Sequence, residues 1–408
     1  MIACETEQDD DQEEPDVTAS ELLLSGSCGP DLGLRAAVTE QSATRVAQQF
    51  AGAGFDLPAG ARNKSRRSSQ PRAVRSVLPI QDTTGAVAYY IINYREDGFV
   101  IVAADRRVQP ILAYSEAQPF VADAVGAGLD EWLYATMLVV EEARRSGAPA
   151  TRDIAVQWDH ILGVPDDDEC LSPRKKDIPV PGPDQCQDSS TSVGPLMTTT
   201  WGQGCGYNSL TPPAANLGCG GLPCSHAFTG CVATAMAQVM RHHKFPVSYD
   251  WASMPNTFGT AATAQLMRDV GQAVDMSYSC DGSGADTKGQ VASSFVNDFG
   301  YKSASYLDYA GTANYSAVRS NLGLGRPVIF RGGENTGWWI FGQYSNGHAW
   351  VTDGYISSFF CETMTSHLMF HMNWGWDGAN NGWFAFNNFN PGTFTFNYKS
   401  GVVLNIAP

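Results

Sequence analysis

One short run of residues, 229–240, constrains the fold of this chain more than any other stretch. Its apolar residues recur at positions i, i+3, i+4, i+7 and i+8, which is the pattern of a helix buried along one face. These residues are Val232, Ala235, Met236, Val239 and Met240. Thr229 or Gly230 can cap this helix, so Cys231 falls in its first turn. Unpaired backbone N–H groups and the positive end of the helix dipole favour the thiolate of a cysteine placed there.

A cysteine at this position has two interpretations. In an exported protein it is often buried or half of a disulfide, but two later segments supply partners for catalysis. His348 lies in a strand-like run at 346–355, and Asn373 comes just before a Trp-Gly-Trp turn within 370–378. A cysteine, a histidine and an asparagine in this order, far apart in the chain, follow the order of a papain-type site.

Each of these residue types has a role in such chemistry. Cys231 would attack a carbonyl group as thiolate, and His348 would hold the proton and deliver it to the leaving amine. Asn373 would accept a hydrogen bond from the other ring nitrogen and so orient the imidazole. Gln203 would donate its side-chain amide to the developing oxyanion, beside the N–H of the cysteine. Trp374 would shield the bond between asparagine and histidine from water.

Four segments around these residues resemble the streptopain family of cysteine peptidases. Residues 230–246 resemble its nucleophile helix, 348–354 its histidine segment, 373–376 its asparagine segment and 201–208 its oxyanion-hole segment. The resemblance implies a papain-like α+β peptidase domain and a cysteine endopeptidase that is made as a zymogen. It also implies protein or peptide substrates and no cofactor.

Length, composition and charge set the outer limits. A chain of 408 residues with 43% hydrophobic content is long enough for more than one core. The formal net charge of −16 argues against a nucleic-acid partner, which would need a basic face. No run approaches the roughly 18 consecutive apolar residues of a membrane span.

The first residues, 1–30, read as an acidic tether. Met1–Cys4 resembles the end of a bacterial lipoprotein signal, which makes Cys4 a candidate lipid anchor. The apolar helix that should precede such a site is missing, so Met1 is either an alternative start or a trimmed boundary. In bacterial lipoproteins, an acidic run just after the cysteine accompanies display on the outer surface. The alternative interpretation of residues 1–30 is a trimmed, disordered N-terminus. We therefore expect a secreted protein or one anchored at the bacterial surface.

Residues 31–150 form a second unit of mixed helix and strand. Its expected elements are a helix at 39–50, an exposed basic connector at 62–75, strands at 88–94, 98–103 and 111–115, and a helix at 132–145. The hairpin around 98–105 resembles the propeptide of streptopain-like zymogens, which covers the active-site cleft. We therefore expect residues 31–150 to be an inhibitory propeptide that acts within its own chain.

Residues 151–194 change in character to Asp, Pro, Ser and Lys. Such a composition buries too little apolar surface to fold by itself and is typical of a processing linker. The peptidase domain is then expected over residues 195–408.

Ten cysteines support export. Besides Cys4 and Cys231, eight remain and allow four disulfides in any of 105 connectivities: Cys28, Cys170, Cys186, Cys205, Cys219, Cys224, Cys280 and Cys361. The spacing of Cys219 and Cys224 near His226 also suggests a metal site. It is not a standard zinc pair, so we expect disulfides and no metal.

Other histidines and other functions compete with this interpretation. His242 and His243 are expected to cap the carbonyl groups at the end of the nucleophile helix. His371 lies on the same strand face as Asn373, but the Gly-His-Ala context favours His348 as the base. The loop at 332–339 is expected to border the substrate groove.

Two further functions stay open. An acyl transferase or amidase would use the same triad but would lack a propeptide over the cleft. An inhibitor or adhesin without catalysis would have no need to retain the four site residues together.

Overall fold

The computed structural model describes residues 36–50, 71–122, 127–162, 189–308, 312–335, 344–360, 365–385 and 401–408. The acidic tether with Cys4, most of the basic connector, residues 163–188 of the expected linker, and the loop tip at 336–339 lie outside these residues. So do Cys28, Cys170, Cys186 and Cys361.

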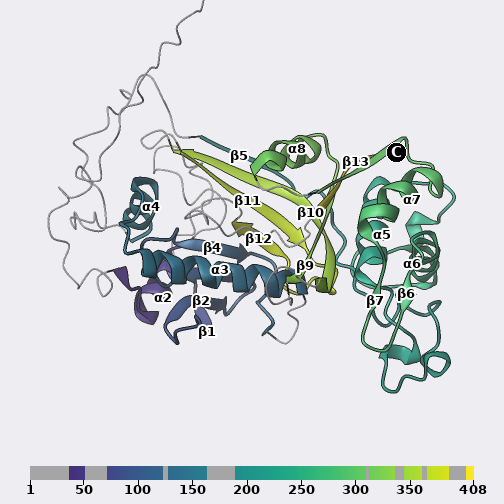
Figure 1. The fold of residues 1–408 in the computed structure, drawn as a ribbon, viewed down its shortest axis with the longest axis horizontal. Coiled ribbons are helices and arrows are strands. Elements are labelled where there is room, and N and C mark those ends of the chain that lie inside the picture. The colour runs from purple at the N-terminus through teal and green to yellow at the C-terminus, as the bar shows by residue number, and fades with distance from the viewer. Residues whose placement is uncertain are drawn as a thin grey trace, which may run out of the picture.

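One antiparallel sheet runs through both halves of the chain (Figure 1). Its strand order is β1-β2-β3-β4-β12-β11-β10-β9-β13-β8, and β5 pairs with β10 beside this path. The strands are β1 Val74–Gln81, β2 Val87–Tyr94, β3 Phe99–Ala103, β4 Ile111–Ser115, β5 Ser189–Val193, β8 Ser303–Asp308, β9 Val328–Asn335, β10 Tyr344–Phe360, β11 Thr365–Asn373, β12 Gly382–Ala385 and β13 Gly401–Ala407.

The helices lie in two groups (Figure 1). The first group, α2 Glu40–Gln49, α3 Ala127–Ser146 and α4 Arg152–Leu162, packs with β1–β4. The second group is α5 Cys231–His243, α6 Ala261–Ala273 and α7 Ala292–Asn297, and it lies on the other side of Figure 1 with the short hairpin β6 Ser277–Tyr278 and β7 Ser283–Gly284. Helix α5 packs against β10, and α7 packs against β8 and β13. Helix α8 Thr312–Gly323 packs against β9, β10 and β13. Within the described residues, no helix is long and apolar enough to span a membrane.

The two halves join through strand pairing. Ala113 and Tyr114 of β4 pair with Phe384 and Trp383 of β12, so the N-terminal strands extend the C-terminal sheet edge to edge. Trp132 of α3 packs edge-on against Phe384, with ring centroids 5.0 Å apart. Each half thus covers apolar surface of the other.

Most N-terminal elements match the expectations from sequence. Helix α2 begins after Thr39, whose hydroxyl accepts a hydrogen bond from the N–H of Ser42. Strands β2, β3 and β4 and helix α3 are also confirmed, and α3 begins five residues earlier than expected. Strand β1, by contrast, occupies a segment that was partly assigned to the basic connector.

The expectation of an unfolded linker over 151–194 is wrong at both ends. Residues 152–162 form α4, whose buried residues Ile154, Ala155, Trp158 and Ile161 make a helical stripe. The indole of Trp158 donates to the carbonyl of Val108, 2.8 Å away. At the other end, β5 pairs with residues 355–359 of β10. The acidic and Pro-rich composition of the segment hid the helical stripe of α4, whereas β5 has the polar sequence Ser-Ser-Thr-Ser-Val and carries no apolar pattern.

Strands β9, β10 and β13 separate two hydrophobic cores. Along β10, Trp350 packs into the core shared with the N-terminal half, whereas Ala349 and Val351 pack into the core around α5 and α6. Successive side chains of a strand point to opposite faces of a sheet, which explains the division. This alternation decides which side chains can reach Cys231.

Candidate functional site

Cys231 is the first residue of α5, as the sequence predicts. Gly230 precedes it with φ +89°, and a Cβ at this position would lie 2.7 Å from the sulfur of Met276. A residue without a side chain is therefore needed at this turn. Among the described residues, Cys231 is the only cysteine outside a disulfide.

The thiol of Cys231 is less acidic than its place on the helix suggests. Its desolvation raises the pKa above the ordinary value, against the opposing effect of backbone N–H groups of Ala349, Val232 and Cys231 itself. The expected stabilisation of the thiolate by the helix end is thus present but smaller than the desolvation. In this arrangement the thiol is neutral near pH 7.

The backbone just after His348 approaches Cys231, but the side chain of His348 points to the other face of the sheet. The N–H of the following residue, Ala349, is directed at the thiol. The imidazole instead packs beside Trp350 and Trp376, with ring centroids 6.0 and 4.9 Å away. Its Nε2 donates to the carbonyl of Trp374 at 2.9 Å. Burial among these rings lowers the pKa of His348 to about 4.

Asn373 makes none of its hydrogen bonds with His348. Its side chain bonds to Gln238 of α5, to the carbonyl of Thr199 and to the N–H of Gly375. The expected bond between asparagine and histidine is therefore not formed here. Asn373 faces the core around α5, whereas the imidazole of His348 faces the other side of the sheet.

Gln203 lies beside the start of α5. Its carbonyl accepts a hydrogen bond from the N–H of Thr229 at 3.0 Å, two residues before the cysteine. Its side chain is partly exposed, and its amide forms no hydrogen bond within the described part of the chain. The preceding Gly202 is closely packed, because a Cβ there would lie 2.2 Å from a carboxylate oxygen of Asp377.

Two disulfides brace the loop between Gln203 and Cys231. Cys205 pairs with Cys224, and Cys219 pairs with Cys280 next to the β6–β7 hairpin. The preference for disulfides over a metal at Cys219 and Cys224 agrees with this pairing. Among the described residues, no group of three or more acidic, cysteine or histidine side chains could hold a metal ion.

Trp374 is buried with its indole donating to the carbonyl of Asn380 at 3.1 Å. Its ring stacks on Trp376, with centroids 5.7 Å apart, and tilts against Trp350. It therefore helps to form the aromatic pocket of His348. Its expected role over a bond between Asn373 and His348 is not realised in this arrangement.

The other histidines have partners of their own. Nδ1 of His371 lies 2.6 Å from a carboxylate oxygen of Asp353, whose second oxygen accepts from the N–H of Met197. His242 bonds to the carbonyl of Gly325, and His243 lies 3.4 Å from the hydroxyl of Tyr301. The prediction that these two histidines cap α5 is wrong, because both side chains turn away to neighbouring elements.

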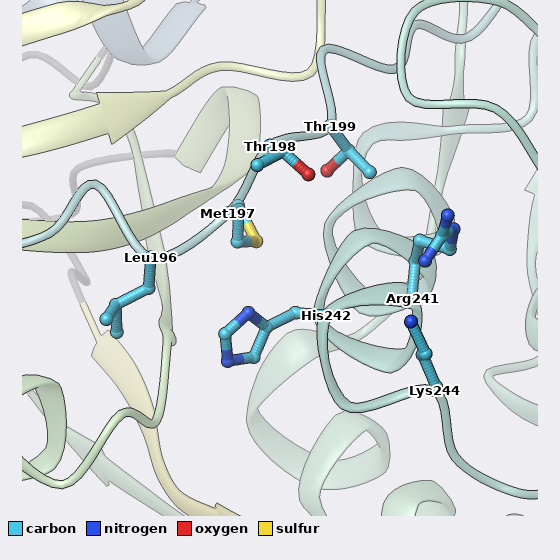
Figure 2. Close-up of a pocket in the computed structure, with 7 residues that line it drawn as sticks. All are labelled: Leu196, Met197, Thr198, Thr199, Arg241, His242 and Lys244. Atoms are coloured by element: carbon cyan, nitrogen blue, oxygen red, sulfur yellow. The ribbon is translucent and has the colours of Figure 1, made fainter.

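A small cavity lies at the far end of α5 (Figure 2). Residues 196–199 line one side and Arg241, His242 and Lys244 the other. Cys231 lies at the opposite end of the helix and takes no part in it. None of the candidate catalytic residues lines the cavity, although Asn373 bonds to the carbonyl of Thr199 at its edge.

Gln238 is the residue of this site whose role the sequence did not reveal. It lies in residues 230–246, the segment that resembles the nucleophile helix, but the neighbouring residues in the sequence do not indicate its hydrogen-bond partners. The available signal was a polar side chain inside an otherwise apolar helix stretch, which in a buried helix implies a specific hydrogen-bond partner.

Each half of the chain matches a known protein family. Residues 201–384 match the Peptidase C10 family, and residues 35–139 match the Spi protease inhibitor. The thiol protease/hemagglutinin PrtT of Porphyromonas gingivalis is 28% identical over 376 residues, which cover 78% of this chain and 37% of that protein. Streptopain of Streptococcus pyogenes is 25% identical over 370 residues, covering 78% of this chain and 80% of streptopain.

A solved structure shares the fold. A mutant fragment of Prevotella intermedia prointerpain A aligns with a TM-score of 0.54 and 25% identity. The alignment covers 82% of this chain and 99% of the fragment. The chain spans little more than a third of the length of PrtT. The similarity to PrtT therefore concerns only the matched region and not the whole of PrtT.

Proposed function

We propose that the chain is the latent form of a streptopain-like cysteine endopeptidase that cleaves proteins through Cys231. Residues 201–384 match the Peptidase C10 family, and residues 35–139, ahead of them, match the Spi protease inhibitor. The observation that carries the proposal is the placement of Cys231 at the start of α5, with the backbone N–H of Ala349, the residue after His348, directed at its thiol.

The reaction follows from the chemistry of these groups. The thiolate of Cys231 attacks the scissile carbonyl carbon, and the oxyanion accepts hydrogen bonds from the Cys231 N–H and the Gln203 amide. His348 gives its proton to the leaving amine, so the C–N bond breaks and an acyl-enzyme remains. Water then attacks the thioester, with His348 as base, and the acid product leaves. Asn373 orients the imidazole, and Trp374 excludes water from it.

The described arrangement supports latency. The imidazole of His348 is neutral and faces away from the thiol, and the thiol is neutral as well. A thiolate–imidazolium pair needs both groups on one side of β10. Activation therefore requires the side chain of His348 to leave its aromatic pocket and turn toward α5.

The propeptide is well placed to hold this latent arrangement. Helix α3 contacts β9 and β10, and its core is continuous with the aromatic residues around His348. Asn380 and the backbone of Val121 form a reciprocal pair of hydrogen bonds, 2.7 and 3.1 Å long. Together with the pairing of β4 and β12, these contacts brace the segment that follows Asn373.

Processing should remove the propeptide together with α4. Helix α4 contacts α2, and Trp158 donates to the carbonyl of Val108, so the N-terminal unit extends beyond residue 150 to at least residue 162. Strand β5 pairs with β10 of the peptidase half. We therefore place the cut between residues 162 and 189, earlier than the start near residue 195 that the sequence suggested.

The disulfides support export, because such bonds form and persist in oxidising compartments. We propose a secreted or surface-anchored peptidase, with Cys4 as the candidate lipid anchor. Mass spectrometry of the N-terminal peptide from the native host would detect the acyl chains, and an unmodified Cys4 would refute the anchor.

The full chain and its Cys231→Ala variant test the activity. Incubated alone, the wild-type chain should shorten to a product beginning between residues 163 and 189 and should hydrolyse casein. The variant should stay full length and inactive, yet be cut when wild-type enzyme is added. His348→Ala should also stay full length and inactive, and His226→Ala, a change at a histidine outside the proposed site, is its matched control and should behave as wild type.

The outcomes separate the alternatives. Casein hydrolysis by a folded Cys231→Ala chain would exclude the thiol mechanism. Acyl transfer to an added amine, with little hydrolysis, would indicate a transferase. If no reaction is seen after removal of the propeptide, the protein would be an inhibitor or adhesin without catalysis.

A further inference from the structure

Gln238 is a fully buried amide in the middle of the nucleophile helix. It lies seven residues after Cys231 on α5, or about two helical turns, so the two side chains leave the helix on the same side. Its relative exposure is 0%, and the α5 residues on either side of it are buried apolar residues. A buried amide without partners would be strongly destabilising, so its hydrogen bonds need to be accounted for.

Gln238 bonds to two of the segments that carry the proposed site. Its Oε1 accepts from the N–H of Trp201 at 3.2 Å and from Nδ2 of Asn373 at 3.3 Å. Its Nε2 donates to Oδ1 of Asn373 at 3.2 Å. Trp201 lies two residues before Gln203, so one side chain joins the oxyanion segment, the nucleophile helix and the asparagine segment.

The partners define which end of each amide is oxygen. The carbonyl of Thr199 only accepts, so the group 2.8 Å from it must be Nδ2 of Asn373. The N–H of Gly375 only donates, so it meets Oδ1 at 3.3 Å. In the same way the N–H of Trp201 selects Oε1 of Gln238. At neutral pH, where a carboxyl group is ionised and only accepts, the amide of Gln238 supplies both the acceptor and the donor that this network uses.

We propose that Gln238 is a positioning residue of the peptidase: it orients the side-chain amide of Asn373, and through it the imidazole of His348, relative to the nucleophile helix and the oxyanion segment. The proposal rests on the proposed function of the Cys231 site. Gln238 touches neither substrate nor the reacting atoms. Its contribution is to hold the side-chain amide of Asn373 in a fixed orientation. Oδ1 of Asn373 accepts from Gln238 and from Gly375, so the N–H of His348, once it turns toward α5, takes the place of the 3.3 Å bond from Gly375.

Three variants of the full chain test this role. In Gln238→Leu both bonds to Asn373 and the acceptor for Trp201 are lost at similar volume. In Gln238→Glu an ionised carboxylate still accepts from Trp201 and from Nδ2 of Asn373, but it cannot donate to Oδ1. Gln272→Leu changes an exposed glutamine of α6 and is the matched control. Each chain is matured with immobilised wild-type enzyme, which is then removed.

We expect Gln238→Leu to lower kcat by about 10- to 100-fold with KM changed less than about two-fold, in the range seen when groups that orient a catalytic residue are removed. Gln238→Glu should lose more activity as the pH rises, because only its protonated carboxyl group can donate to Asn373. Gln272→Leu should match wild type. In an Asn373→Ala background, Gln238→Leu should cause no further loss of kcat.

The results separate this inference from the proposed function. A wild-type kcat in folded Gln238→Leu, or losses that multiply fully in the double variant, would overturn the positioning role. If Gln238→Leu does not fold, Gln238→Glu decides, and a loss of kcat that is the same at every pH would refute the proposal. Failure of the proposed function has another signature, because Cys231→Ala or Asn373→Ala would then leave cleavage unchanged.

Discussion

Acid should destabilise the latent arrangement through His348. The residue is 7% exposed and its ring packs among tryptophan rings, and burial lowers its pKa to about 4 from an ordinary 6.5. The unfolded chain therefore binds a proton between these two values that the folded chain does not bind. Stability contributed by the neutral imidazole is present above pH 6.5 and is lost as the pH falls toward 4.

The size of the effect follows from the two pKa values. Between pH 7 and pH 5 the proton taken up by the unfolded chain alone lowers the free energy of unfolding by about 2 kcal/mol. The same change favours any state in which the imidazole has left its pocket. We therefore also expect the wild-type zymogen to release His348 more readily at pH 5 than at pH 7.

Urea unfolding of two inactive chains measures how much His348 changes the free energy of unfolding between pH 7 and pH 5. One carries Cys231→Ala alone, which prevents self-processing, and the other adds His348→Gln, which keeps a donor for the carbonyl of Trp374. Other groups titrate equally in both chains, so the difference between them isolates His348. The first chain should lose about 2 kcal/mol more than the second from pH 7 to pH 5. Equal losses in the two chains would refute the buried, neutral imidazole.

Three further changes test the site, the propeptide interface and the braced loop. Gln203→Ala should lower kcat by about 10²- to 10³-fold with little effect on KM, measured with a peptide substrate, and a rise in KM alone would make it a substrate-binding residue. Trp132→Ala, in a separated propeptide of residues 36–162, should weaken inhibition of the mature enzyme by at least about 100-fold, because the ring packs on Phe384 and its indole donates to the carbonyl of Ala385. Tyr134→Ala, at an exposed site of α3, should leave inhibition unchanged. Replacing both Cys205 and Cys224 by serine should lower the free energy of unfolding by about 3 kcal/mol, because their disulfide closes a loop of 19 residues. Urea unfolding without reductant measures this loss.

Local patterns in the sequence were sufficient for the elements that matter most. The helical stripe after Gly230 placed Cys231 at the start of a buried helix, and this is where it lies. The helix expected over residues 39–50 is α2, and the short, mostly apolar runs at 88–94, 98–103 and 111–115 are β2, β3 and β4. Such features arise from hydrogen bonds and side-chain periods within a few residues, so they can be read without knowledge of the tertiary structure.

The orientation of His348 could not be read in this way. The run from His348 to Val351 has bulky or apolar residues on both faces of β10, because both faces are buried, so alternation carries no sign of which face meets α5. A single step in register exchanges the two faces. Only the packing of two separate cores against the sheet decides it.

The same limit applies to the partners of Gln238 and of the cysteines. The sequence shows a buried amide and an even number of thiols, but it does not show that Asn373 lies 135 residues away in the chain and yet within hydrogen-bond distance. Cys219 likewise pairs with Cys280 across 61 residues. The sequence determined which residues are available for the chemistry. The tertiary structure decided which of them meet, because contacts between distant segments depend on how whole strands and helices pack.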